Sequence, residues 1–144
     1  MRSKRSVPDR LILVLAEPEA SFDKLSSELC RTGASVLLAG DGSSAMRALR
    51  EHNVRISSLV TDTAVRGGLS GRALPFWYRF YNPFGPVIYL SHEPSHEFVT
   101  VQYSGVLKRR CRSAEVIREI SRIEEEVRSA YAADARIAGW TLSA

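Results

Sequence analysis

The sequence has few cysteines and no long hydrophobic run. Its two cysteines, Cys30 and Cys111, lack the close spacing of zinc ligands, and two are too few for the disulfide framework of a small secreted domain. No apolar stretch approaches the length needed to cross a bilayer. These absences favour a protein without a membrane anchor that works in a reducing, cytoplasmic setting.

Positive charge is present but not concentrated. The 144 residues carry a formal net charge of +4, yet only Arg2, Lys4 and Arg5 lie close together, in a basic N-terminal extension over 1–9. We therefore expect no nucleic-acid partner. The start MRSKRS…LILVLA has the composition of a signal peptide, but its apolar part, 11–16, is short and precedes two glutamates. We interpret it as a buried strand.

The remaining pattern predicts one globular α/β domain. With 44% hydrophobic and 25% charged residues, a chain of this length can bury its own core. Short apolar runs alternate with segments of helical period, which is typical of a parallel sheet covered on both faces. The predicted strands cover 11–15, 36–39, 56–60, 87–90 and 106–107.

Three amphipathic segments predict helices. The first ends near Gly33, the second begins after Asp41, and the last begins at Ser113 and pairs Glu124 with Arg128. Right-handed crossovers between the strands predict a doubly wound, five-stranded parallel sheet in the order 2-1-3-4-5. We assign 10–131 to this domain and 132–144 to a C-terminal tail. The apolar stripes of the helices are formed by Phe22, Leu25 and Leu29, by Ala45, Met46 and Leu49, and by Val116, Ile117, Ile120, Ile123 and Val127.

Polar residues stand at or near the carboxyl ends of four predicted strands. Ligand sites of doubly wound sheets lie at this edge, so we expect Glu17, Asp62, Ser91 and Lys108 to lie close together. Their chemistry is that of phosphoryl transfer to a carboxylate. Asp62 would be the nucleophile, Glu17 a ligand for Mg²⁺, Ser91 a hydroxyl donor and Lys108 a mobile positive charge.

At these positions the chain resembles the receiver domains of bacterial two-component response regulators, over roughly 11 to 126. TDTAVRGGLSG (61–71) is similar to the stretch that follows the family's phosphoacceptor aspartate, and DGSSAMRAL (41–49) to the start of its second helix. PVIYLS (86–91) resembles its fourth strand, which ends in Thr or Ser, and VLK (106–108) its fifth strand with the lysine. The four pieces occur in the family's order.

The resemblance implies a flavodoxin-like fold and a stand-alone signalling domain rather than an enzyme. A histidine kinase or phosphotransfer protein would transfer a phosphoryl group to Asp62. Mg²⁺ would be held by Glu17, Asp62 and the carbonyl of Ala64, while Ser91 and Lys108 would engage the phosphoryl oxygens. Output would pass through protein contacts.

Several residues depart from the family pattern. Ala16 and Glu17 stand where receivers have two adjacent acids, and in an alternative register neither acid remains. Arg66 and Arg109 replace prolines, and Gly105 replaces the switch aromatic. A second hypothesis is therefore a degenerate receiver that binds its partner constitutively, without phosphorylation.

The connection from Ser91 to Lys108 is short for the family, and its sequence HEPSHEFVTVQYSG (92–105) has Pro94 where a fourth helix is expected, so that helix should be shortened or missing. It also spells H-E-x-x-H with His92 and His96, the pattern of zinc hydrolases. Pro94 inside the motif and the lack of a third histidine downstream make zinc hydrolysis a distant alternative to a loop with two exposed imidazoles.

Six of the twelve aromatic residues lie in FWYRFYNPFG (76–85). They cannot all face one core, so either they cover the space left by the short fourth helix, or Trp77, Tyr78 and Tyr81 form a partner or homodimer contact. Cys30 should pack as a small apolar residue, whereas the basic KRRCR context could lower the pKa of Cys111.

Overall fold

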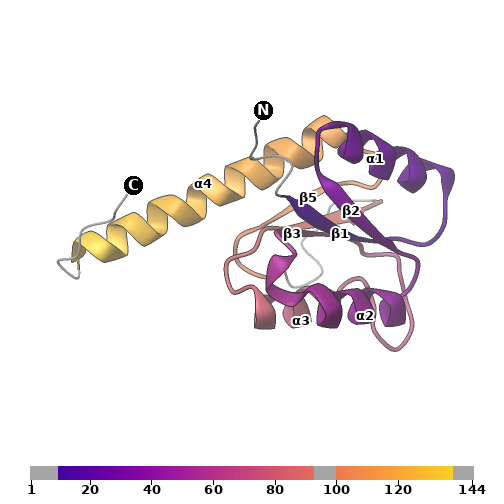
Figure 1. Cartoon of the computed structure of the whole chain (residues 1–144), viewed down its shortest axis with the longest axis horizontal. Coiled ribbons are helices and arrows are strands. Elements are labelled where there is room, and N and C mark those ends of the chain that lie inside the picture. Colours follow the sequence, from indigo (N-terminus) through magenta and orange to yellow (C-terminus); the bar gives the residue numbers. More distant parts are fainter. Residues whose placement is uncertain (1–9, 93–99, 138–144) are drawn as a thin grey trace.

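Five short strands pair in parallel to form one sheet in the order β2-β1-β3-β4-β5, as the sequence predicts (Figure 1). The structure is a computed structural model, and it describes residues 10–92 and 100–137. The elements in chain order are β1 (Leu11–Leu15), α1 (Ala20–Arg31), β2 (Ser35–Ala39), α2 (Gly42–His52), the 3₁₀ helix η2 (Asn53–Arg55), β3 (Ser58–Asp62), α3 (Leu74–Tyr81), β4 (Val87–Ser91), β5 (Ser104–Lys108) and α4 (Ser113–Ile137).

Helices cover both faces of the sheet, because alternate residues of each strand point in opposite directions. Ile12 and Val14 of β1 pack in a core with α1 and α4, whereas Leu13 and Leu15 pack in a second core with α2 and α3 (Figure 1). All four side chains are fully buried, which explains why β1 reads as a continuous apolar run.

Local signals set the C-terminal end of α1 and the start of α2, as predicted. Gly33 follows α1 with a φ of 98°, a left-handed conformation that glycine adopts without strain. Asp41 precedes α2, and its carboxylate accepts a hydrogen bond from the backbone N–H of Ser44 at 2.8 Å. This bond lowers the pKa of Asp41.

The described residues between β4 and β5, which are 92 and 100–103, form no helix, and residues 93–99, where we expected a short or missing fourth helix, lie outside the described residues. The prolyl residue and the second histidine of the H-E-x-x-H motif, Pro94 and His96, lie outside the described residues, as does the extension over 1–9.

The last helix differs from the prediction in two ways. α4 continues to Ile137, so the tail that we placed at 132–144 is helical over its first part. Glu124 does not pair with Arg128; it forms a two-pronged contact with Arg10 at 3.0 and 2.9 Å, and Arg128 pairs with Glu125. Neither α4 nor any other helix in the described part of the chain is both long and apolar enough to cross a membrane.

The glycine-rich turn after β3 folds back over the end of that strand. The N–H of Gly71 donates to the carbonyl of Val65 at 3.0 Å, and the hydroxyl of Thr61 donates to the carbonyl of Gly71 at 2.7 Å. A Cβ atom at Gly71 would overlap the backbone carbonyl of Asp62. Position 71 therefore requires glycine because two backbone segments touch there.

We expect Gly71→Ala to lower the free energy of unfolding by at least about 2 kcal/mol, since the backbone of Asp62 cannot move away from an added methyl group without disturbing β3. Gly68→Ala in the same turn is the matched control. An added Cβ at Gly68 meets nothing within 4 Å, so its effect should stay within about 0.5 kcal/mol. Urea unfolding of both variants measures the difference; equal losses would contradict the close-approach argument.

Candidate functional site

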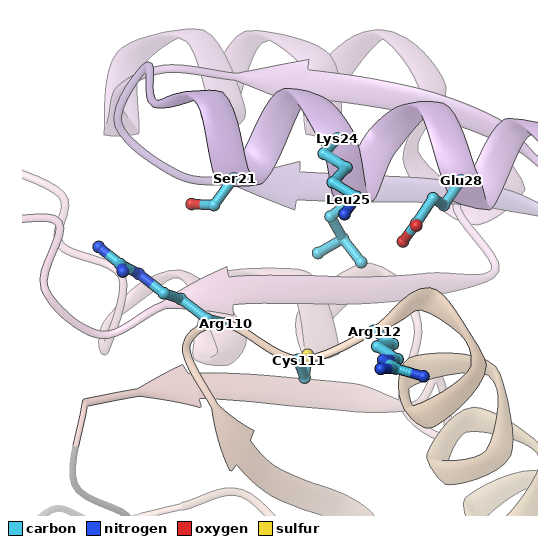
Figure 2. Close-up of a pocket in the computed structure, with 7 residues that line it drawn as sticks. All are labelled: Ser21, Lys24, Leu25, Glu28, Arg110, Cys111 and Arg112. Atoms are coloured by element: carbon cyan, nitrogen blue, oxygen red, sulfur yellow. The ribbon is translucent and has the colours of Figure 1, made fainter.

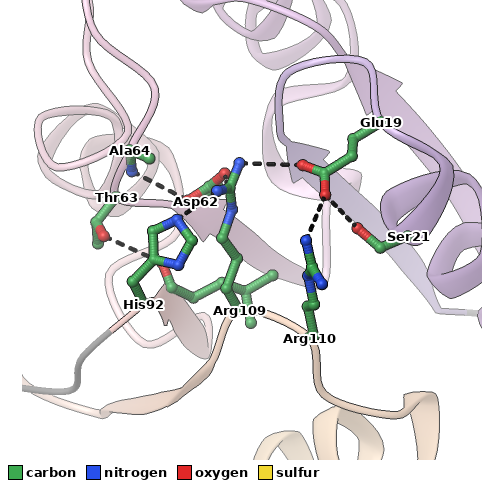
Figure 3. A network of polar contacts seen from close by, with 9 residues as sticks. Glu19, Ser21, Asp62, Thr63, Ala64, His92, Arg109 and Arg110 are labelled. Atoms are coloured by element: carbon green, nitrogen blue, oxygen red, sulfur yellow. Dashed lines mark hydrogen bonds and ion pairs between the residues drawn. The ribbon is translucent and has the colours of Figure 1, made fainter.

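Asp62 ends β3 at the carboxyl edge of the sheet, where the sequence predicts it, and it is fully buried. Its Oδ1 atom accepts a hydrogen bond from the backbone N–H of Ala64 at 3.0 Å. Its Oδ2 atom accepts one from Nε of Arg109 at 3.1 Å (Figure 3). Both carboxylate oxygens therefore have partners within the protein.

Arg109 is the centre of the polar contacts at this edge. It follows β5 directly, and its side chain is 16% exposed. Besides Asp62, it contacts Oε2 of Glu19 at 3.2 Å and Nε2 of His92 at 2.6 Å (Figure 3). Its Cζ also lies 5.3 Å from the ring centroid of Phe22. We call these five residues the Arg109 cluster. All three guanidinium nitrogens have a partner within it.

His92 belongs to this cluster as a hydrogen-bond acceptor. A guanidinium group only donates hydrogen bonds, so Nε2 of His92 must accept, and the proton of the neutral ring lies on Nδ1. A ring nitrogen that binds Arg109 is not free to bind zinc, and among the described residues no group of three or more histidine, cysteine, aspartate or glutamate side chains could hold a metal ion. The zinc interpretation of His92 and His96 therefore gains no support from the part of the chain that the structure describes.

The three other residues that the sequence places beside Asp62 make different contacts. Ser91 ends β4 and is nearly buried, and its backbone carbonyl accepts the N–H of Arg109 at 2.9 Å. Glu17 and Lys108 are exposed, and neither side chain forms a hydrogen bond or ion pair with a described residue. Lys108 is the last residue of β5, whereas Arg109 lies in the turn that follows, and it is the side chain of Arg109 that reaches Asp62.

Glu19 takes the place that we expected for Glu17. It precedes α1, and its carboxylate contacts Arg109, accepts a hydrogen bond from the hydroxyl of Ser21 at 3.1 Å and lies 3.6 Å from Nη2 of Arg110 (Figure 3). Sequence analysis missed Glu19. The available signal was Arg109 itself. This residue places a cation where receivers usually have proline, and a partly buried cation needs a nearby carboxylate.

The predicted Mg²⁺ ligands do not fit a metal site in this arrangement. Glu17 is exposed and apart from the cluster, whereas Asp62 and Glu19 both bind the guanidinium of Arg109. Ala64 contributes its N–H to Asp62. The cation that bridges the two carboxylates is thus a side chain of the protein.

A cavity of about 420 Å³ lies between α1 and the loop that joins β5 to α4 (Figure 2). Lys24, Arg110 and Cys111 are among the residues that line it.

The expectation for Cys111 was wrong: burial, with a smaller effect of Glu115, raises the pKa of the thiol to about 11. The expectation for Cys30 was also wrong, because that residue is exposed.

The aromatic segment divides between core and surface. Tyr78 is fully buried and its hydroxyl donates to the carbonyl of Ile56 at 2.9 Å, so its assignment as a partner-binding residue was wrong. Tyr81 is half-buried against the same core. Trp77, Phe76 and Phe80 are 50%, 53% and 79% exposed, so these three rings are not packed in the described core.

Comparison with solved structures finds the same fold. A response regulator receiver protein from Sinorhizobium medicae WSM419 is 23% identical, with a TM-score of 0.71 over 79% of this chain and 93% of that chain. The chemotaxis protein CheY4 of Vibrio cholerae is 18% identical, with a TM-score of 0.66 over 79% of this chain and 98% of that chain. A receiver domain protein from Clostridium thermocellum is also 18% identical, with a TM-score of 0.66 over 84% and 98%. No protein-family model and no curated protein matches the sequence.

The contact between Asp62 and Arg109 should stabilise the fold strongly. We expect Arg109→Gln to cost about 3 kcal/mol of unfolding free energy, because it leaves the buried carboxylate without its cation. The double variant with Asp62→Asn should cost less than the sum of the two single changes, with a coupling of about 1 kcal/mol or more.

Arg110→Gln is the matched control for this cycle. Arg110 is 77% exposed and its contact with Glu19 is longer, so its loss should stay within about 0.5 kcal/mol. Additive losses for Asp62 and Arg109 in urea unfolding would contradict the coupling.

The raised pKa of Cys111 predicts a slowly reacting thiol. In a Cys30→Ser background, about one thiol in a thousand would be deprotonated at pH 8, so the alkylation rate should still rise above pH 10. Glu115→Gln should move this rise to lower pH, because the negative charge of Glu115 opposes the thiolate; Glu125→Gln, on the same helix, should not. A midpoint below about pH 9 would contradict the burial of this thiol.

Proposed function

We propose that this chain, which has the fold of a response regulator receiver domain, is a two-component signalling module that works through protein contacts without accepting a phosphoryl group on Asp62. The observation that supports this proposal is the ion pair between the fully buried Asp62 and Arg109. The fold favours a signalling domain over an enzyme with a substrate pocket.

A carboxylate that attacks phosphorus needs an oxygen that faces the phosphoryl donor. In this chain Oδ1 and Oδ2 of Asp62 accept hydrogen bonds from Ala64 and Arg109, and no part of the residue reaches solvent. Phosphorylation would first require Arg109 to leave. That movement would strip Asp62 of its counter-ion in a buried position, which is costly.

The charges at the site argue in the same direction. A receiver that accepts a phosphoryl group needs a cation to offset the incoming negative charge, and Mg²⁺ supplies that charge in phosphoryl transfer. Here Arg109 already bridges Asp62 and Glu19, and a guanidinium stays positive throughout the physiological pH range. A divalent ion brought to these carboxylates would meet that positive charge.

The second candidate is the phosphoacceptor function, with a histidine kinase or phosphotransfer protein as the donor to Asp62. It is favoured by Asp62 and Ser91, which end neighbouring strands, and by the register that pairs Ser91 with Lys108. In this case Arg109 would have to move aside when the donor binds.

Intact mass spectrometry distinguishes the two candidates. The protein is incubated with Mg²⁺ and a small-molecule phosphodonor, beside an ordinary receiver domain as a positive control. We expect the control to gain one phosphoryl group and this chain to stay unmodified, because Arg109 is hydrogen-bonded to Oδ2 of Asp62.

A phosphoryl adduct on the wild-type chain that is absent from Asp62→Asn would overturn the proposal and establish the second candidate. Arg109→Gln, included in the same experiment, tests the cause. An adduct that forms on this variant and not on the wild-type chain would identify the guanidinium as the group that blocks Asp62.

A further inference from the structure

The end of α4 extends beyond the sheet and has little of the domain to pack against (Figure 1). Val116, Ile120 and Ile123 of this helix are fully buried, and Val127 is half-buried, but no residue from 128 to 134 is buried. We call residues 128–137 the overhang. The overhang continues a helix that is already formed, but it gains little packing from its own domain, so a second surface that covered it would stabilise it.

An apolar groove of about 290 Å³ lies at the base of the overhang. Its apolar lining comes from Phe84, Tyr103, Val127, Ala130 and Tyr131. The rings of Phe84 and Tyr131 are 59% and 57% exposed. Tyr103 has a φ of +58°, which is strained for a large side chain, and its ring stands 6.2 Å from that of Phe84. The groove therefore presents aromatic surface to solvent.

We propose that this groove binds the overhang of a second copy of the chain, in a two-fold symmetric dimer whose α4 helices pair in an antiparallel direction. Tyr131 lies at the centre of this contact. Because the two α4 helices run in opposite directions, the end of the overhang of one copy lies over the groove at the base of the overhang of the other copy. Such a contact uses the same patch on both copies, as a closed dimer requires.

The charges on the overhang select a second copy in this orientation. Arg128 and Asp134 lie three residues before and three residues after Tyr131, on the side of α4 that lines the groove. An antiparallel pair centred on Tyr131 brings Arg128 to the level of the partner's Asp134, and the symmetry repeats the pair. Glu124 does not compete, because Arg10 already binds it at 2.9 Å. Arg128 pairs with Glu125 of its own helix, but both side chains are exposed, and a pair of this kind is weak enough to be exchanged for one with the partner's Asp134.

The same charges disfavour a parallel pair. In that arrangement Arg128 would face the partner's Arg128, and Asp134 would face the partner's Asp134. Like charges at matched positions weaken helix pairing. A parallel pair would also carry each overhang away from the groove of the other copy.

The oligomeric state of the full chain tests this proposal, and it does not depend on whether Asp62 is phosphorylated. Sedimentation equilibrium should give a dimer for the wild-type chain. Arg128→Asp and Asp134→Arg should each weaken the dimer by about tenfold or more, because each creates two like-charge pairs. An equimolar mixture of the two variants should regain the dimer, since every facing pair is then of opposite sign.

Arg118→Asp is the matched control. Arg118 is exposed on the same helix and away from the groove, so this reversal changes the net charge by the same amount as Arg128→Asp and should leave the dimer intact. Circular dichroism confirms that each variant is folded. A monomeric wild-type chain at about 100 µM, or a mixture of the two charge variants that stays monomeric, would overturn the proposal; so would a dimer that Trp77→Ala dissolves and Tyr131→Ala does not.

Discussion

The contact between Arg109 and Asp62 is the interaction on which the carboxyl edge of the sheet depends. A carboxylate that is 0% exposed keeps its charge at little cost only where a cation and hydrogen bonds replace water. Arg109 provides that cation from the end of β5, and it also binds Glu19 after β1 and His92 after β4. One guanidinium thus links residues at or just after the carboxyl ends of four strands, β1, β3, β4 and β5. The position of each of these residues depends on the others.

The fold was largely predictable because its signals are local. The apolar run at Leu11–Leu15, the capping residue Asp41 and the left-handed Gly33 each act through near neighbours, and each has the role that its sequence context predicts. The general rule for parallel sheets then placed Asp62 and Ser91 at one edge. Nothing beyond strand order was needed for that step.

The partners of Asp62 were less predictable because they depend on the direction of single side chains. Lys108 and Arg109 are adjacent, and only the path of the chain beyond β5 decides which of them turns toward Asp62. The choice of Glu19 over Glu17 depends in the same way on the loop before α1. For Tyr78, the rotation of α3 about its axis decides that this ring and not Phe80 enters the core. That rotation cannot be predicted from a segment in which nearly every residue is aromatic.

The short loop between Arg109 and Ser113 connects the ion pair to the start of α4, so a movement at one can be passed to the other. At about 1.5 Å per residue, the 25 residues of this helix form a rod of about 37 Å whose fixed end is four residues from the ion pair. A tilt of about five degrees at that end would displace the far end by roughly 3 Å. Because Val116, Ile120 and Ile123 pack the first part of this helix against the sheet, a change around the guanidinium reaches the far end of the rod only if that packing shifts with it.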